Sequence, residues 1–123
     1  MRKVILLLVL SIFLISACAQ QKPEQNAAKP SGELKEFKIT SNQFQFEPST
    51  IEVNKGDKVR LIVTSIDVPH GIAIPEYGIN ERLDPGKSVA IEFTADKQGT
   101  FTAFCSVFCG SGHSNMKGRI VVR

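Results

Sequence analysis

The chain has 123 residues and a mass of 13.5 kDa, which leaves room for one small domain and excludes a multi-domain enzyme within this length. Hydrophobic residues make up 42% and charged residues 22%, a balance that predicts a packed core. The formal net charge is +3, but residues 33–123 carry 11 Lys and Arg against 11 Asp and Glu. Because a phosphate-binding surface needs a clustered basic excess, no nucleic-acid partner is expected.

The first 17 residues have the pattern of a secretory signal peptide. A short basic stretch precedes a 12-residue apolar run, 4–15, which is shorter than the ~20 residues that span a bilayer. Residues 15–18 (Ile-Ser-Ala-Cys) resemble the bacterial lipobox, where cleavage before the cysteine leaves it lipid-modified. We therefore expect a lipoprotein signal peptide over 1–17, a lipid on Cys18 and export to the outer side of a bacterial membrane. An uncleaved short anchor and ordinary secretion are the alternatives.

Residues 18–32 are expected to form the lipidated cysteine and a flexible tether. Gln, Ala, Pro and Lys dominate residues 19–32, and no apolar periodicity is present. Fourteen flexible residues span roughly 20 Å end to end. Such a tether would hold a domain near the membrane without fixing its orientation.

From about Leu34 onward the hydrophobic pattern has a period of two, which predicts half-buried strands and no long helix. Turn residues separate the strands at the short spacing typical of an antiparallel sandwich or barrel. About 90 residues with six to eight strands predict a small all-β sandwich. The clearest alternating segments are 37–40, 58–64 and 88–94, the turns are 54–57, 84–87 and 97–99, and a closing strand is expected at 118–123.

One loop concentrates the chemistry of the chain. Cys105, Cys109, His113 and Met116 fall within twelve residues, between one strand that ends near Cys105 and another that begins near residue 117. The sequence has one other histidine, His70, and no other methionine besides the initiator. If His70 folds onto this loop, the site uses every internal soft or borderline metal ligand of the domain. This concentration predicts a metal site.

The residue types favour copper. Zinc seldom takes methionine, whereas thiolate together with thioether suits copper. A mononuclear blue-copper site uses one Cys, two His and a weak axial Met, but this loop has a second Cys. Two thiolates can bridge two coppers. One imidazole would then bind each copper as a terminal ligand. The donor count therefore fits a binuclear centre better than a mononuclear one.

The spacing Cys-x3-Cys-x3-His-x2-Met, with His70 about 35 residues earlier in the segment 65–71, resembles the CuA domain of cytochrome c oxidase subunit II. Residues 46–59 are similar to the opening strands of cupredoxins. The resemblance covers 37–123, is closest to the compact subunit II of B-type haem-copper oxidases, and implies a Greek-key β-sandwich over 33–123. Nitrous-oxide reductase carries the same spacing, but this length has no room for the large propeller domain of that enzyme.

The resemblance also implies a function and a ligand set. The domain would hold two copper ions and pass single electrons, from cytochrome c towards the catalytic subunit of a haem-copper oxidase, without catalysis of its own. The implied roles are bridging thiolates for Cys105 and Cys109, one terminal imidazole each for His70 and His113, and weak ligation by the Met116 thioether and the Val107 carbonyl oxygen.

Several alternatives stay open from the residues alone. An exported copper storage or delivery protein would use the same ligands. Cys105 and Cys109 could form a disulfide, although the closed loop would be very small. His70 could be an ordinary loop histidine, and Met116 could simply fill the core.

The aromatic and glycine residues near the loop carry weaker expectations. The sequence has no Trp, so the tryptophan cluster through which many subunit II proteins receive electrons is missing, and Phe44 is one of the two nearest aromatics. Phe104 and Phe108 are expected to pack in the core or around the site. Gly110 and Gly112 are expected to allow the tight backbone of the loop.

Overall fold

The alternating segments form strands whose apolar side chains face inward. In a computed structural model, which describes residues 32–123, the side chains of Val59, Leu61 and Val63 are completely buried. On the later strand, Ile91 is buried, whereas Ala90 beside it is exposed. The predicted alternation is therefore confirmed, and it puts the expected face of each strand in the core.

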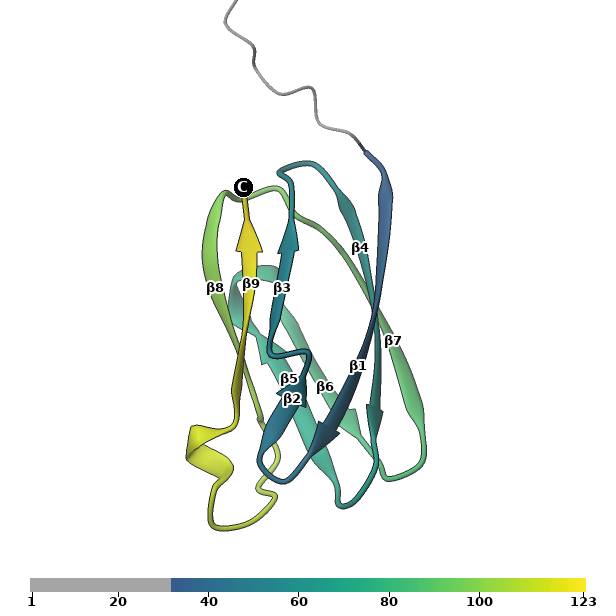
Figure 1. Cartoon of the computed structure of the whole chain (residues 1–123), viewed down its shortest axis with the longest axis vertical. Helices are drawn as coiled ribbons and strands as arrows, with labels where there is room; N and C mark the ends of the chain where they lie inside the picture. The colour runs from purple at the N-terminus through teal and green to yellow at the C-terminus, as the bar shows by residue number, and fades with distance from the viewer. Residues whose placement is uncertain (1–31) are drawn as a thin grey trace, which may run out of the picture.

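The described residues contain nine strands and two short 3-10 helices (Figure 1). They are β1 (Leu34–Asn42), β2 (Gln45–Glu47), β3 (Thr50–Val53), β4 (Lys58–Ser65), β5 (His70–Ile74), η1 (Pro75–Tyr77), β6 (Ile79–Leu83), β7 (Ser88–Thr94), β8 (Gly99–Phe104), η2 (His113–Asn115) and β9 (Lys117–Val122).

The strand count exceeds the six to eight expected from the sequence. The two shortest strands, β2 and β3, have 3 and 4 residues, too few to show a period. Strand β6 lies at the edge of its sheet, and only Ile79 and Leu83 at its ends are buried. Because its three middle residues are polar and exposed, this strand shows no hydrophobic alternation.

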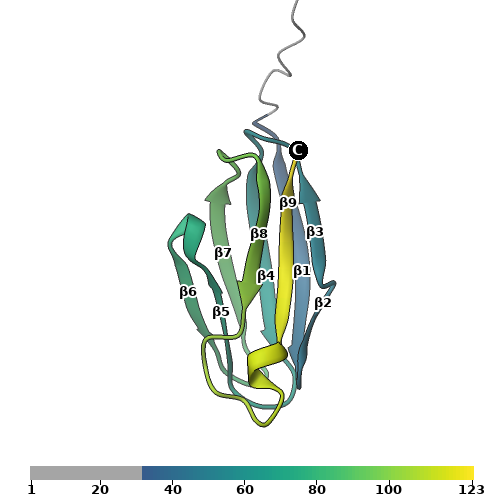
Figure 2. The same ribbon diagram turned by 90° about the vertical axis from the view of Figure 1, so that its left-hand side faces the viewer.

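The strands form two sheets that pack face to face. One sheet has the order β2-β1-β4-β7, and the other has the order β3-β9-β8-β5-β6 (Figures 1 and 2). The chain passes from one sheet to the other after β2, β3, β4, β6 and β7. Strand β1 runs parallel to β4, and β3 runs parallel to β9. The expected Greek-key β-sandwich is confirmed.

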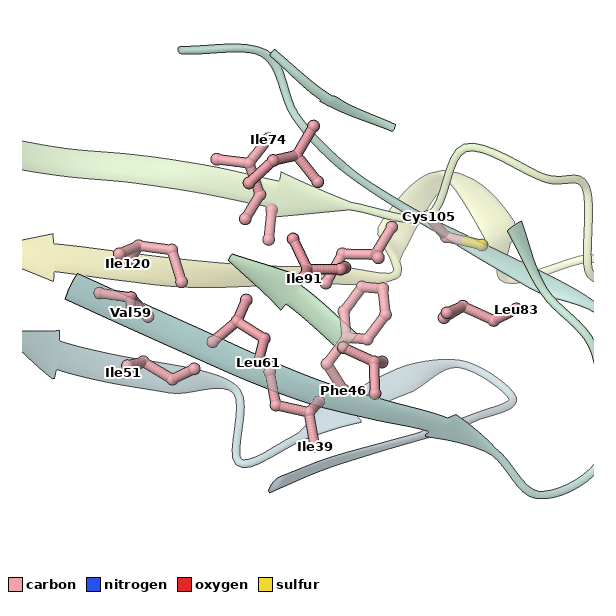
Figure 3. Packing of buried hydrophobic residues seen from close by; sticks show 14 of the residues in the cluster. Ile39, Phe46, Ile51, Val59, Leu61, Ile74, Leu83, Ile91, Cys105 and Ile120 are labelled. Atoms are coloured by element: carbon pink, nitrogen blue, oxygen red, sulfur yellow. The ribbon is translucent and has the colours of Figure 1, made fainter. Parts of the chain in front are cut away.

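The core runs the length of the sandwich and ends at the loop from Cys105 to Met116. Leu61, Ile72, Ile74 and Leu83 are among its largest fully buried side chains. Burying such a side chain stabilises the fold by about 1.5–3 kcal/mol relative to leaving it exposed. Figure 3 shows the sulfur of Cys105 at one end of this cluster, on the same side as Leu83.

Four connections meet at the end of the sandwich that holds the loop from Cys105 to Met116. They are the β1–β2 turn, the β4–β5 loop, the β6–β7 turn and the loop between β8 and β9, whereas β1 begins and β9 ends at the opposite end (Figures 1 and 2). Residues far apart in the sequence can therefore contact one another here.

No helix within residues 32–123 is long and apolar enough to cross a membrane. The signal peptide, the lipidation site Cys18 and most of the tether fall outside the described residues, so these assignments stay predictions.

Candidate metal centre

His70 begins strand β5 and is completely buried. Its ring nitrogen Nδ1 lies 3.8 Å from the sulfur of Cys105, which is 35 residues away in the sequence. The preceding loop is held by the Ser65 hydroxyl, which donates a hydrogen bond to the Val68 carbonyl at 2.5 Å. The start of a core strand therefore fixes this imidazole.

The remaining predicted ligands lie on the loop from Cys105 to Met116. The Cys105 amide donates to the Met116 carbonyl at 3.1 Å and closes the base of the loop. Gly110 has a φ of +135°, which favours glycine, and its carbonyl accepts the His113 amide at 3.1 Å. The expected backbone role of this glycine is confirmed, and the turn brings His113 back towards Cys109.

The structure brings the predicted donor atoms into one cluster. The sulfurs of Cys105 and Cys109 are 3.7 Å apart, and His113 Nδ1 is 3.7 Å from the Cys109 sulfur. The Met116 sulfur lies 3.9 Å from the Cys109 sulfur, and the Val107 carbonyl oxygen lies 3.1 Å from the Cys105 sulfur. Both cysteines are free thiols, at a separation well above the ~2.05 Å of a disulfide.

The chemistry of this cluster fits a soft metal ion. The ligand atoms of His70, Cys105 and Cys109 all lie within 4.8 Å of one another, and all three residues are buried. Burial, together with the hydrogen bond to Cys105, raises the pKa of the Cys109 thiol to about 11. A bound metal must displace such thiol protons, and thiolate with imidazole and thioether suits copper.

Asp67 supports His70 from outside the cluster. Its Oδ1 lies 2.8 Å from His70 Nε2 and also accepts the Val68 amide at 2.6 Å, while its Oδ2 accepts the Gln43 amide at 2.6 Å. Burial acts to raise the pKa of Asp67, but these hydrogen bonds outweigh it and hold the pKa below its ordinary value. The carboxylate thus orients the ring so that Nδ1 faces the sulfurs.

Asp67 is a residue of the site to which the sequence pattern alone assigns no role. A carboxylate three residues before a candidate histidine ligand is a usable signal, since metal-bound imidazoles commonly donate to a carboxylate. The loop geometry that brings the two side chains together could not be read from the sequence.

The β1–β2 turn packs against the other side of the loop. Gln43 Nε2 donates to the Cys109 carbonyl at 2.7 Å. The ring of Phe44 lies so close to Gly110 and Gly112 that a Cβ at either glycine would collide with it. The expected backbone role of Gly112 is not confirmed, because its φ of −92° suits any residue; the close approach of Phe44 is what requires a glycine there.

Phe108 lies beside the site but does not pack in the core. Its side chain is 78% exposed, because the middle of the loop projects beyond both sheets. Its ring centroid lies 5.6 Å from that of His113. Phe104 at the end of β8 is also exposed, at 36%. An aromatic residue next to candidate ligands is therefore displayed on the surface.

Comparison with known proteins agrees with the β-sandwich fold described above. The sequence matches the family described as "Cupredoxin-like domain" over residues 5–122. The chain belongs to the cupredoxin-like family. This cupredoxin is 36% identical to cytochrome c oxidase subunit 2 of Thermus thermophilus over 80 residues, which cover 65% of the chain and 59% of that subunit.

Two further similarities extend over more of this cupredoxin. Nitrous-oxide reductase of Ralstonia nicotianae is 33% identical over 108 residues, which cover 85% of this chain but only 17% of the reductase. A solved chain of a heme-copper terminal oxidase dimer is 27% identical with a TM-score of 0.71, covering 99% of this chain and 95% of that chain. This cupredoxin therefore spans under two thirds of both curated relatives and nearly all of the solved oxidase chain.

Proposed function

We propose that this cupredoxin holds two copper ions in a CuA-type centre and transfers single electrons. One observation carries the proposal: two buried thiols face each other at 3.7 Å, and each has its own imidazole nitrogen within 3.8 Å. A mononuclear cupredoxin site needs only one thiolate. The symmetric arrangement of thiols and imidazoles supports a pair of metals.

The proposed ligands follow from which atoms lie near each sulfur. Cys105 and Cys109 would hold both coppers through their thiolates, His70 would be a ligand on the Cys105 side, and His113 would be a ligand on the Cys109 side. The thioether of Met116 is a weak ligand on the Cys109 side, and the Val107 carbonyl is a weak ligand on the Cys105 side. Only the backbone of Val107 is used, so its side chain can vary.

The protein contributes a rigid and largely dry frame. The Cys105–Met116 hydrogen bond closes the loop, and the side chain of Met116 is fully buried. When bound, the copper pair supplies a carrier that shares one electron over two metals. Because the frame fixes the ligands, little rearrangement should accompany electron transfer. No side chain has to act as an acid, base or nucleophile.

The proposed role is electron entry to a haem-copper oxidase, with a cytochrome c as the donor. The likeness to oxidase subunit 2 and to a chain of a terminal oxidase dimer supports this role. We propose further that the domain is exported and attached to the membrane by a lipid on Cys18. The support for the lipid is the lipobox-like sequence at residues 15–18.

The metal content tests the centre directly. Copper-loaded protein should contain two coppers per chain and give an electron paramagnetic resonance signal in which one unpaired electron couples to both nuclei. One copper per chain at full loading, with the spectrum of a blue-copper site, would overturn the binuclear proposal.

A second measurement separates electron transfer from copper delivery. Stopped-flow mixing with reduced cytochrome c should reduce the copper-loaded protein, while its copper resists transfer to an apo-oxidase. Because residues 33–123 are neutral overall, the rate should depend weakly on ionic strength. Absence of electron exchange together with ready copper loss would favour a copper-delivery protein.

A further inference from the structure

The β1–β2 turn contacts both segments that position the proposed ligands. On one side lies the β4–β5 loop, where Asp67 orients His70. On the other side lies the loop that carries Cys109. These two segments are far apart in the sequence, so contacts between them and a third segment can fix their relative position.

Gln43 makes a hydrogen bond to each side. Its side-chain Nε2 donates to the Cys109 carbonyl at 2.7 Å, across 66 residues of sequence. Its backbone amide donates to Asp67 Oδ2 at 2.6 Å, across 24 residues. One residue thus links the carboxylate behind the first imidazole to the backbone of the second thiol.

The hairpin does not need this side chain for its own structure. Strands β1 and β2 pair through the registers Asn42–Gln45, Ser41–Phe46 and Thr40–Glu47, none of which involves the Gln43 side chain. That amide instead leaves the hairpin and contacts the carbonyl of a proposed ligand residue. The direction of the Cys109 carbonyl is coupled to the backbone torsions that aim its sulfur.

We propose that Gln43 is a positioning residue of the copper site, which ties the Cys109 backbone to the Asp67–His70 pair and thereby fixes the two halves of the site relative to each other. This inference rests on the proposed copper function. Outer partners of metal ligands typically change metal affinity by about 10–100-fold when they are removed. Gln43 acts one step further out, through a backbone carbonyl and a carboxylate.

The test uses two matched substitutions on the same hairpin. Gln43→Met keeps a similar side-chain length but removes the amide donor, and Gln45→Met makes the same change at an exposed position on β2. We expect Gln43→Met to lose copper to a chelator about 10-fold faster or more. Its paramagnetic resonance signal should broaden or split, because the site samples several geometries. Gln45→Met should match the wild-type protein in both measurements.

Two further variants separate the positioning role of Gln43 from a general loss of stability. Gln43→Asn retains the donor but shortens its reach by one methylene, so copper loss should be faster than in the wild type. Combining Gln43→Met with Asp67→Asn should give a non-additive effect on copper retention, since both changes loosen one linked unit. Thermal unfolding of each copper-free variant reports any general loss of stability.

The outcomes distinguish this inference from the function on which it rests. If the wild-type protein binds two coppers but Gln43→Met behaves like Gln45→Met, the positioning role is wrong and the proposed function stands. A lowered unfolding temperature with an unchanged copper signal and loss rate would also overturn the positioning role. A wild-type protein that holds no copper pair would overturn both.

Discussion

The two proposed histidine ligands are held by different parts of the molecule. His70 begins a core strand, is completely buried, and has a carboxylate on its outer nitrogen. His113 begins η2, a 3-10 helix of three residues, is only partly buried, and lies beside the exposed ring of Phe108. The sandwich therefore fixes one half of the site, whereas loop hydrogen bonds fix the other.

This difference gives the site an inner side and an outer side. A partner protein can approach the His113 side of the site, because His113 is only partly buried and the ring of Phe108 beside it is exposed. It cannot approach His70 without displacing the residues around it. Two ligands of the same type can therefore have different roles. His70 is anchored in the core, whereas His113 lies on the side that a partner can reach.

The largest expected effect comes from removing one of the two thiols that the two halves share. Cys109→Ser should leave one copper or none, because one thiolate cannot form a bridge of two sulfurs. Copper analysis and paramagnetic resonance of the loaded variant test this expectation. Two electronically coupled coppers in Cys109→Ser would show that the proposed bridge is wrong.

The inner and outer histidines should differ in chemical rescue. Both His70→Gly and His113→Gly should lose the binuclear signal. Added imidazole should restore it in His113→Gly, because that position is partly open, but not in the closed position of His70. Titration with imidazole, followed by the visible spectrum, measures the contrast. Equal rescue of both variants would remove the distinction between the two sides.

Asp67→Asn should alter the inner half selectively. The carboxylate makes the His70 imidazole a stronger donor, which favours the oxidised metal. Its loss should raise the reduction potential, by ~59 mV for each tenfold change in the relative affinity for the two oxidation states. Voltammetry measures the shift. The control is Asp84→Asn, which removes the same charge from a turn where the carboxylate pairs with Arg82, and it should leave the potential unchanged.

Met116→Leu should have the smallest effect of the four. The side chain is fully buried, and an exchange of similar volume costs less than about 1.5 kcal/mol of folding free energy. Both coppers should stay, and only the reduction potential should move, because a weak ligand is lost. Loss of one copper from this variant would mean that the thioether is a principal ligand.

The sequence was sufficient where a local pattern determines the structure. Alternation placed the inward faces of β4 and β7, and the spacing of Cys105 to Met116 identified the loop. The nearness of His70 to this loop was inferred from ligand chemistry and the family resemblance. Its 3.8 Å approach to the Cys105 sulfur agrees with that inference.

The features missed from the sequence depend on the path of the chain, and two of them are contacts between distant segments. The parallel pairing of β1 with β4 and the bond from Gln43 to Cys109 join residues that no periodicity relates. Edge strand β6 has apolar residues only at its ends. Phe108 is a large aromatic residue that the backbone carries out to solvent. Composition predicts none of these, because each follows from the path of the chain.

The close packing of Phe44 against Gly110 and Gly112 bears on how far the loop can be transplanted. Any side chain at either glycine would collide with that ring, so both positions are closed to substitution while Phe44 is present. A graft of residues 105–116 onto a different cupredoxin scaffold would carry the donor atoms but not the surface that shapes them. The smallest portable unit of this site is therefore discontinuous, and it includes Gln43 and Phe44 of the β1–β2 turn.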